Sequence, residues 1–305
     1  MSEPAIHTVL GPVAPTELGL CLPHEHLICD FSAVTGSLDH LLNDVELAVD
    51  ELALFAAAGG RALVEITPPD LGRDPLALRA IAERSGVHIV MATGWYRRAF
   101  YPDELDRTPT AELAERMVHE LTQGVGDTGV RAGIIGEIGV DRDVVSAVEE
   151  RVLRAAARAQ HRTGAAISTH SSMYPVGLAQ LDVLEDEGVD PSRVIIGHAD
   201  TFLDRDYHAA LLQRGVMVQF DTAGRNHMNP DERRAKAFVE LAHGGWLHRL
   251  LLSSDRCFRS DLVAFGGAGY AHVLTTFRDL LLAAGLTAAE FDVVTIENPA
   301  RALAW

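Results

Sequence analysis

Four histidines, one glutamate and one aspartate stand in short motifs whose chemistry suits divalent metal ions. In chain order the motifs are His24-Glu25-His26, Gly136-Glu137-Ile138-Gly139, Thr169-His170, Gly197-His198 and Ser253-Ser254-Asp255. Neutral imidazole and carboxylate are ligands that Zn²⁺ and its neighbouring divalent metals accept. In an extended segment alternate side chains point to the same side, so His24 and His26 can reach one ion. These residue types at these spacings predict a metal site.

The set is larger than one catalytic zinc ion needs, because such a site keeps about three protein ligands and an open position. Two ions about 3.5–4 Å apart, bridged by a carboxylate, would use the whole set. We expect one ion to be bound by His24, His26 and Asp255 and the other by His170 and His198. Glu137 would lie between the two ions and bind both. Zn²⁺ is the expected metal, with Mn²⁺ or Co²⁺ as alternatives. A hydroxide bridging the ions would be the nucleophile, because metals bring the pKa of bound water toward 7.

Each motif taken alone has a simpler interpretation. A lone histidine after a strand is commonly hydrogen-bonded or exposed, Glu137 could pair with an arginine, and Asp255 could cap a helix. These interpretations would all have to hold at the same end of one sheet. A metal site accounts for the residues together.

The segments that must position these residues alternate between strand and helix. Apolar runs of strand length occupy 19–22, 62–66, 88–93, 132–137, 165–170, 194–198, 216–220 and 250–253. Amphipathic segments occupy 44–58, 75–84, 111–123, 144–162, 176–187, 204–214, 231–243 and 270–284. Continuous apolar strands, each followed by a helix, predict a single (β/α)₈ TIM barrel over residues 1–305. In this fold the active site lies at the carboxyl ends of the strands, where the metal-binding motifs stand.

The composition argues against several other classes of protein. The chain has 305 residues and a net charge of −17, which argues against a nucleic-acid partner. It lacks an apolar run long enough for a membrane span, so we expect no membrane association. Three sparse cysteines and an amino terminus unlike a secretory signal favour the cytoplasm. We expect a small-molecule substrate and, since symmetric dimers are the commonest oligomers, a homodimer.

The motifs and their flanks resemble the phosphotriesterase family of the amidohydrolase superfamily over nearly the whole chain. The resemblance covers 8–12, 18–27, 132–139, 167–170, 196–198, 252–255 and 297–300. It implies a (β/α)₈ barrel with two metal ions and hydrolysis by a bridging hydroxide. The implied ligands are His24, His26, His170, His198 and Asp255. It also implies that Asp255 accepts a proton during the reaction.

This chain departs from many members of that family at the metal bridge. Those members use a carboxylated lysine where this sequence has Glu137, and the glutamate resembles the bacterial phosphotriesterase-homology branch. Lys236, the only lysine, lies in the helix after the seventh strand, so a lysine bridge is excluded. The family includes triesterases, lactonases, esterases and amidases. The resemblance therefore implies hydrolysis of an ester, lactone or amide, with phosphotriester hydrolysis as a side activity, and leaves the substrate open.

The loops after the third, seventh and eighth strands carry the residues expected to contact the substrate. Tyr96 stands at a place that resembles the family's active-site tyrosine, where it would donate to a substrate carbonyl or to the bridging water. Packing within the loop is the alternative. The candidate substrate-binding arginines are Arg97, Arg225, Arg256 and Arg259. A guanidinium suits a carboxylate, sulfonate or phosphate, so we expect an anionic group on the substrate. The alternative is ion pairing with acids such as Asp103, Asp221 or Asp261.

Two other functions remain open from the sequence. TatD-type nucleases are barrels with a similar set of histidines and carboxylates, and residues 136–141 resemble their fourth strand. The acidic composition and the flanks of the first histidine motif argue against a nuclease, which needs a basic groove. The second alternative is a binding protein on a barrel that has lost its activity. Such a protein would be expected to lack some ligands, whereas all are present here.

Overall fold

The computed structural model describes residues 4–171 and 173–305, and its centre is an eight-stranded parallel sheet. The strands are β3 (Cys21–Glu25), β6 (Ala62–Glu65), β7 (His88–Thr93), β8 (Ile134–Gly139), β9 (Ile167–His170), β10 (Val194–Ile196), β11 (Met217–Phe220) and β12 (Leu250–Leu252). Each strand pairs with the next in chain order. Every strand predicted from the apolar runs is present in this sheet.

The sheet closes where β12 returns to β3. The Asp255 N–H donates to the His24 carbonyl at 3.2 Å, and the His26 N–H donates to the Arg256 carbonyl at 3.3 Å. The Ser253 hydroxyl donates to the same His24 carbonyl at 2.8 Å. These bonds join the first and last strands of the sheet, and the predicted (β/α)₈ barrel is confirmed.

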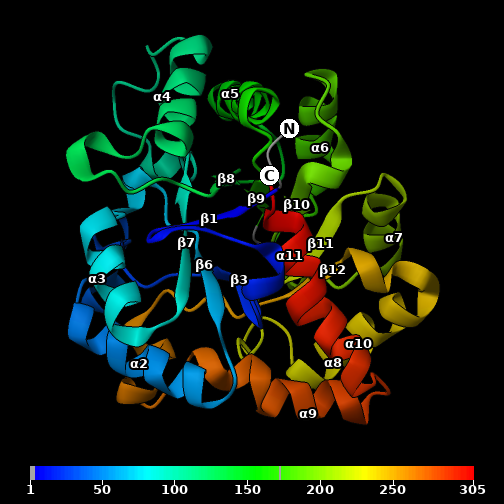
Figure 1. Cartoon of the computed structure of the whole chain (residues 1–305). Helices are drawn as coiled ribbons and strands as arrows, with labels where there is room; N and C mark the ends of the chain where they lie inside the picture. Colours follow the sequence, from blue (N-terminus) through cyan, green and yellow to red (C-terminus); the bar gives the residue numbers. More distant parts are fainter. Residues whose placement is uncertain (1–3, 172) are drawn as a thin grey trace.

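Helices surround the barrel on its outside (Figure 1). The larger ones are α2 (Val45–Ala57), α3 (Pro75–Ser85), α4 (Thr110–Thr122), α5 (Ala147–Thr163), α6 (Gly177–Asp186), α7 (Arg205–Gln213), α8 (Asp231–Leu241) and α9 (Thr276–Ala283). Short helices are α1 (Ser32–Thr35), α10 (Ala288–Asp292) and α11 (Asn298–Leu303). The helix predicted over 270–284 was too long, because its first part is the 3₁₀ segment Tyr270–Leu274. There the Tyr270 hydroxyl donates to the His26 carbonyl at 2.7 Å and ties the segment to the barrel rim.

The core lies on both faces of the sheet. Val64 and Ile66 pack with Val90 in a cluster inside the barrel. Leu63 and Ile89 belong instead to the larger cluster between the sheet and the helices. Neighbouring strand residues point to opposite faces, and both faces are buried, which explains the continuous apolar runs in the sequence.

The amino end of the barrel is covered by both ends of the described chain. The hairpin of β1 (Ile6–Thr8) and β2 (Gly11–Val13) crosses this opening beside α11 (Figure 1). Ala5 and Trp305 exchange two backbone hydrogen bonds of 3.1 Å. The opposite opening carries the long loops, including the small hairpin of β4 (Cys29–Asp30) and β5 (Leu41–Leu42).

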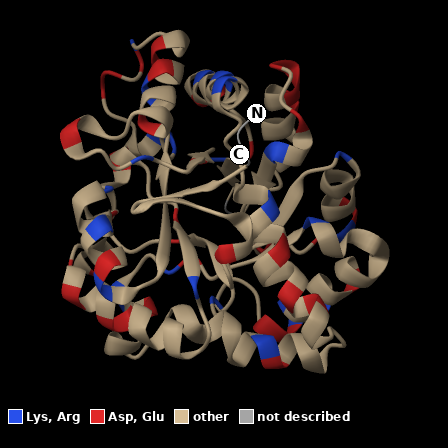
Figure 2. Ribbon diagram, viewed as in Figure 1, with Lys and Arg blue, Asp and Glu red and all other residues tan. Residues whose placement is uncertain are grey.

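Charged side chains lie mainly on the outer helices and loops, while the strands at the centre are largely uncharged (Figure 2). Within residues 4–171 and 173–305, helices with the length and apolarity needed to cross a membrane are absent.

Candidate metal centre and active site

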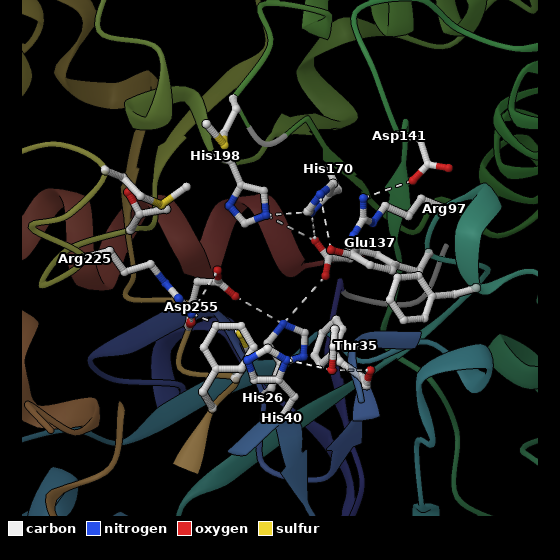
Figure 3. Close-up of a pocket in the computed structure, with 18 of the residues that line it drawn as sticks. His26, Thr35, His40, Arg97, Glu137, Asp141, His170, His198, Arg225 and Asp255 are labelled. Atoms are coloured by element: carbon white, nitrogen blue, oxygen red, sulfur yellow. Dashed lines mark hydrogen bonds and ion pairs between the residues drawn. The ribbon is translucent and has the colours of Figure 1, made fainter. Parts of the chain in front are cut away.

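The expected metal ligands meet at the carboxyl ends of five barrel strands. In Figure 3, His26, His170 and His198 lie around Glu137, and Asp255 lies beside His26. Glu137 Oε2 lies 2.8 Å from His170 Nδ1 and 3.4 Å from His198 Nε2. The same oxygen lies 3.4 Å from His24 Nε2. Glu137 Oε1 lies 3.6 Å from His26 Nε2. The glutamate thus faces both histidine pairs.

Asp255 faces the pair of histidines from the first strand. Its Oδ1 lies 3.3 Å from His26 Nε2 and 3.7 Å from His24 Nε2. Its Oδ2 lies 3.4 Å from an Arg225 nitrogen. One oxygen is therefore available to a metal ion on the His24 side, while the other is held by a cation.

Two compact groups of potential ligands share the glutamate. One consists of His24, His26 and Glu137, and the other consists of Glu137, His170 and His198, with the ligand atoms of each group within 4.8 Å of one another. All of these residues are buried. Neither ring nitrogen of His24 has a hydrogen-bond partner, which is costly for a buried polar group unless another ligand satisfies it. The donor set therefore fits divalent metal ions.

The backbone has unusual conformations where it presents these ligands. His198 and Asp255 have φ angles of 53° and 50°, in the left-handed region that side chains other than glycine enter only rarely. Gly136 has a φ of 137°, and a Cβ there would lie 2.4 Å from the Ser168 carbonyl oxygen. Glycine before Glu137 is thus required by the close approach of β8 to β9.

Two of the expected ligand histidines, His198 and His26, form a hydrogen bond through the nitrogen that faces away from the centre, and His24 lies near a carboxylate without such a bond. Asp221, at the end of β11, lies 2.8 Å from His198 Nδ1 and 3.3 Å from His24 Nδ1. Thr67 Oγ1 lies 2.8 Å from His26 Nδ1 and donates to Glu65 at 2.5 Å. Such contacts fix the tautomer and orientation of a ligating imidazole.

Tyr96 supports the remaining histidine. Its hydroxyl lies 3.3 Å from His170 Nε2, and both side chains are buried. The Tyr96 N–H donates to both carboxylate oxygens of Asp70, at 3.2 and 3.0 Å. Tyr96 also lines the active-site cavity, so it lies where the sequence predicted.

The protonation states of His170 and of the two carboxylates suit metal binding, whereas carboxylates around His26 and His198 outweigh burial and raise the pKa of both rings. Burial lowers the pKa of His170 to about 4, so its ring is neutral at pH 7. Burial alone would raise the pKa of Glu137, but His170 and His24 outweigh it and hold the pKa well below its usual range. The pKa of Asp255 is likewise lowered, because Arg225 and His26 outweigh the effect of burial. Neutral imidazoles and ionised carboxylates are the forms that bind metal.

A cavity of about 380 Å³ opens over this centre. One part of its wall is aromatic and consists of Phe31, Tyr96, Phe100 and Phe258. Another part consists of the basic side chains His40, Arg97, Arg225 and His227. The cavity is therefore suited to an organic substrate that combines apolar and anionic groups.

Arg97 and Arg225 lie in this cavity wall, as the sequence predicted. Arg97 forms an ion pair with Asp141 at 3.0 Å and stacks over the Tyr96 ring at 5.1 Å. Arg225 is buried beside Asp255 and also contacts Asp261 at 3.3 Å. The anticipated pairing of loop arginines with acids therefore occurs, in part with the expected partner Asp261.

Arg256 and Arg259 were predicted to bind substrate, but neither side chain lines the cavity, so this prediction is wrong. Arg256 is fully buried and donates to the carbonyls of Ala223 at 2.8 Å and Gly269 at 3.2 Å. Arg259 donates to the Leu41 carbonyl at 2.8 Å. Both guanidiniums hold loops together at the barrel rim.

Sequence reasoning overlooked Asp221 as a support for the histidines and Glu25 as a support for the loop. Glu25 accepts from the Ser254 N–H at 2.7 Å and from the Arg256 N–H at 2.9 Å. Asp221 follows a barrel strand directly, so the rule that identified His170 would also have identified it. Glu25 lies between His24 and His26, so the alternation of side chains along an extended segment places it on the face opposite to theirs. This alternation is the feature of the sequence that could have identified Glu25 as a residue supporting the site from outside.

A barrel with a buried cluster of histidines and carboxylates at its strand ends is typical of metal-dependent hydrolases. The chain matches the phosphotriesterase family over residues 4–303 and belongs to that family. It is a hydrolase whose family generally uses a divalent metal centre. The TatD-type alternative is not supported by this match.

Individual relatives are similar over nearly their whole length. The phosphotriesterase homology protein of Escherichia coli (strain K12) is 38% identical over 283 residues, 93% of this chain and 97% of the relative. The N-acetyltaurine hydrolase of Homo sapiens is 30% identical, over 96% of each chain. The crystal structure of a lactonase from Listeria monocytogenes has a TM-score of 0.91 and 27% identity, over 98% of each chain.

Proposed function

We propose that this chain is a binuclear metal-dependent hydrolase of ester, lactone or amide bonds, acting on small substrates that bear an anionic group. The observation that carries this proposal is the position of Glu137, whose carboxylate is shared by two groups of potential ligands. A shared carboxylate is the arrangement that holds two ions close together.

The proposed ligands on one side are His24, His26 and Asp255, and on the other His170 and His198, with Glu137 bridging. Zn²⁺ is the proposed metal, with Mn²⁺ or Co²⁺ as alternatives, because the donors are imidazole and carboxylate. When bound, two such ions supply an activated water at neutral pH and polarise the oxygen of the bond to be cleaved.

The chain's own residues contribute proton transfer and orientation. Asp255 is the proposed proton acceptor, and the Arg225 guanidinium 3.4 Å from its Oδ2 keeps that carboxylate ionised and oriented. Proton transfer from the attacking water to Asp255 and on to the leaving group would complete the hydrolysis. Tyr96 orients His170 from behind, and its ring forms part of the substrate cavity.

The basic wall of the cavity supports an anionic substrate. Arg97 is partly exposed and pairs with the Asp141 carboxylate at 3.0 Å, which supports a role for its guanidinium in binding a carboxylate. Relatives named as an N-acetyltaurine hydrolase and a lactonase support amides and lactones as the cleaved bonds. Phosphotriester hydrolysis is the proposed side activity.

The test is a panel of substrates on metal-loaded enzyme, arranged in pairs that differ only in charge. N-acyl amino acids and lactones with a carboxylate are compared with their neutral amide or ester derivatives, and with a phosphotriester. We expect a higher kcat/KM for the anionic member of a pair. Equal or better turnover of the neutral member throughout would contradict the anionic substrate, and absence of any turnover would contradict the hydrolase.

The variant Arg97→Gln separates charge recognition from chemistry. We expect KM for the anionic substrate to rise about tenfold, the loss of roughly one charge-assisted hydrogen bond of 1.5 kcal/mol, with little change in kcat. The neutral partner substrate is the control and should respond weakly. An identical loss on both substrates would mean that Arg97 acts on the fold of the loop.

A further inference from the structure

A second group of cations lies at the amino end of the barrel, opposite the metal centre. Arg193 precedes β10, His248 and Arg249 precede β12, and Arg301 lies on α11. These side chains line one pocket of about 310 Å³. The same end of the barrel faces the viewer in Figure 1, where α11, the helix that contains Arg301, is labelled. The basic pocket, as we name this group, is separate from the active-site cavity.

Each guanidinium in the basic pocket is fixed by a backbone carbonyl rather than by an acid. Arg193 donates to the Gly164 carbonyl at 2.6 Å, and Arg249 donates to the Gly215 carbonyl. Arg301 donates to the His248 carbonyl. Within the described residues, none of these three arginines forms an ion pair, although the chain has a net charge of −17.

Two acids lie near the pocket, and among the described residues neither forms an ion pair with its arginines. Asp190 interacts at longer range with Arg193 and Arg249, and Glu297 interacts with Arg301. Asp190 accepts from the Ser192 N–H at 2.8 Å and thereby caps a short helical turn, and it does not line the pocket. Glu297 is exposed beside Arg301. Burial and, as a smaller cause, the charge of Arg249 lower the pKa of Arg301, while Glu297 opposes this shift. Carbonyl anchoring uses only part of each guanidinium and leaves further N–H donors.

We propose that the basic pocket binds a phosphate group, either as inorganic phosphate or as part of a phosphomonoester. Three pre-positioned guanidiniums suit an oxyanion with more than one negative charge, since arginine forms paired N–H contacts with phosphate oxygens. The pocket is larger than one phosphate ion needs, so a small organic group can accompany the phosphate. Binding there would stabilise the fold, because it joins the loops before β10 and β12 to α11.

The test is thermal unfolding of metal-loaded enzyme in inorganic phosphate or glycerol phosphate, with chloride at equal ionic strength as the reference. We expect phosphate at about tenfold its Kd to raise Tm by roughly 2–4 °C. The double variant R193Q/R249Q should lose this rise. Arg233→Gln removes an exposed arginine on α8 and is the matched control, which should keep the rise. A larger effect of glycerol phosphate than of phosphate would identify the organic ester as the source.

Inhibition of turnover distinguishes this pocket from phosphate binding at the metal centre. R193Q/R249Q should keep the wild-type kcat and the wild-type inhibition by phosphate, since neither residue lies near the substrate. A full Tm rise in R193Q/R249Q, or an equal loss in Arg233→Gln, would overturn the proposal. If the double variant fails to fold, Arg301→Gln takes its place, and an unchanged Tm rise in that exposed variant overturns the proposal equally.

Discussion

Asp221 contacts two of the histidines expected to bind metal, His198 and His24, through the nitrogens that face away from the centre. The carboxylate lies 2.8 Å from His198 Nδ1 and 3.3 Å from His24 Nδ1. It therefore holds His198 by a hydrogen bond and lies in electrostatic contact with His24, so it faces one histidine from each half of the proposed centre. A residue that supports both halves should affect metal affinity more than one that supports a single ligand.

Replacement of Asp221 by Asn should weaken metal binding by about 10–100-fold, because the amide is neutral and orients the imidazoles poorly. Competition with a chelator for Zn²⁺ measures the change. Asp279→Asn, on the exposed face of α9, is the control and should bind as wild type does. Unchanged metal affinity in Asp221→Asn would contradict the supporting role.

Asp255→Asn should lower kcat by about 10²–10⁴-fold, because the amide cannot accept a proton from water. At least one ion should remain bound, since His24, His26 and Glu137 still form a compact group. Steady-state kinetics together with metal analysis checks both parts. A variant that keeps full activity would exclude Asp255 as the proton acceptor.

At the scale of elements, the loops that carry the site depend on a buried ionic network behind β10 and β11. Arg234, on α8, is fully buried and forms ion pairs with Asp200 and Asp231. Asp200 also accepts from the Thr222 N–H at 3.1 Å, and Asp231 accepts from the Gly224 N–H at 2.9 Å. The network thereby fixes the loop that leads from Asp221 to Arg225.

Arg234→Met should destabilise the protein by about 3–5 kcal/mol, because it leaves the buried Asp200 carboxylate without its cation and Asp231 with His272 as its remaining basic partner. Urea denaturation measures the change in the free energy of unfolding. Arg233→Met, at the exposed neighbouring position, is the matched control and should change stability by no more than about 0.5 kcal/mol. Equal effects of the two substitutions would contradict the importance of the network.

The barrel and the cluster of histidines and carboxylates at its strand ends could be predicted from sequence because both depend on short-range signals. Apolar runs mark buried strands, and a polar residue at the end of such a run marks the site. The structural role of Arg256 could not be predicted, because it depends on contacts of the loop after β12 with Glu25 and with the chain near Gly269. Those contacts join distant segments, and local patterns carry no information about them.

At the scale of the whole molecule, the first and last segments of the described chain meet at the amino end of the barrel. His7 packs against Trp305 with 4.3 Å between ring centroids, and the Trp305 indole donates to the Gly133 carbonyl at 2.9 Å. Burial, together with the charge of Arg131, lowers the pKa of His7 to about 4. The packing of these two segments is therefore sensitive to protonation of His7.

The contribution of His7 to stability should be fully present above its unfolded pKa of about 6.5 and decrease as the pH falls toward 4. The sign follows from a lowered pKa, since the folded state prefers the neutral ring. The difference in unfolding free energy between wild type and His7→Gln, measured by urea denaturation at pH 7.5 and at pH 5, should shrink at the lower pH. A difference that grows on acidification would refute this assignment.

The expectation of a homodimer can be checked directly by light scattering on the eluting protein. The chain mass is 33.0 kDa, so a dimer should give twice that value. A mass equal to a single chain at micromolar concentration would show that the barrel is monomeric.

The central claim is that Glu137 is shared by two metal ions, and elemental analysis tests it most directly. After loading with Zn²⁺ or Mn²⁺ and removal of free metal, the wild type should contain about two ions per chain. Glu137→Gln should contain about one or fewer and lose most of its activity, because an amide bridges two cations poorly. A wild-type content of one ion or less per chain, or two ions retained in Glu137→Gln with full activity, would contradict the claim.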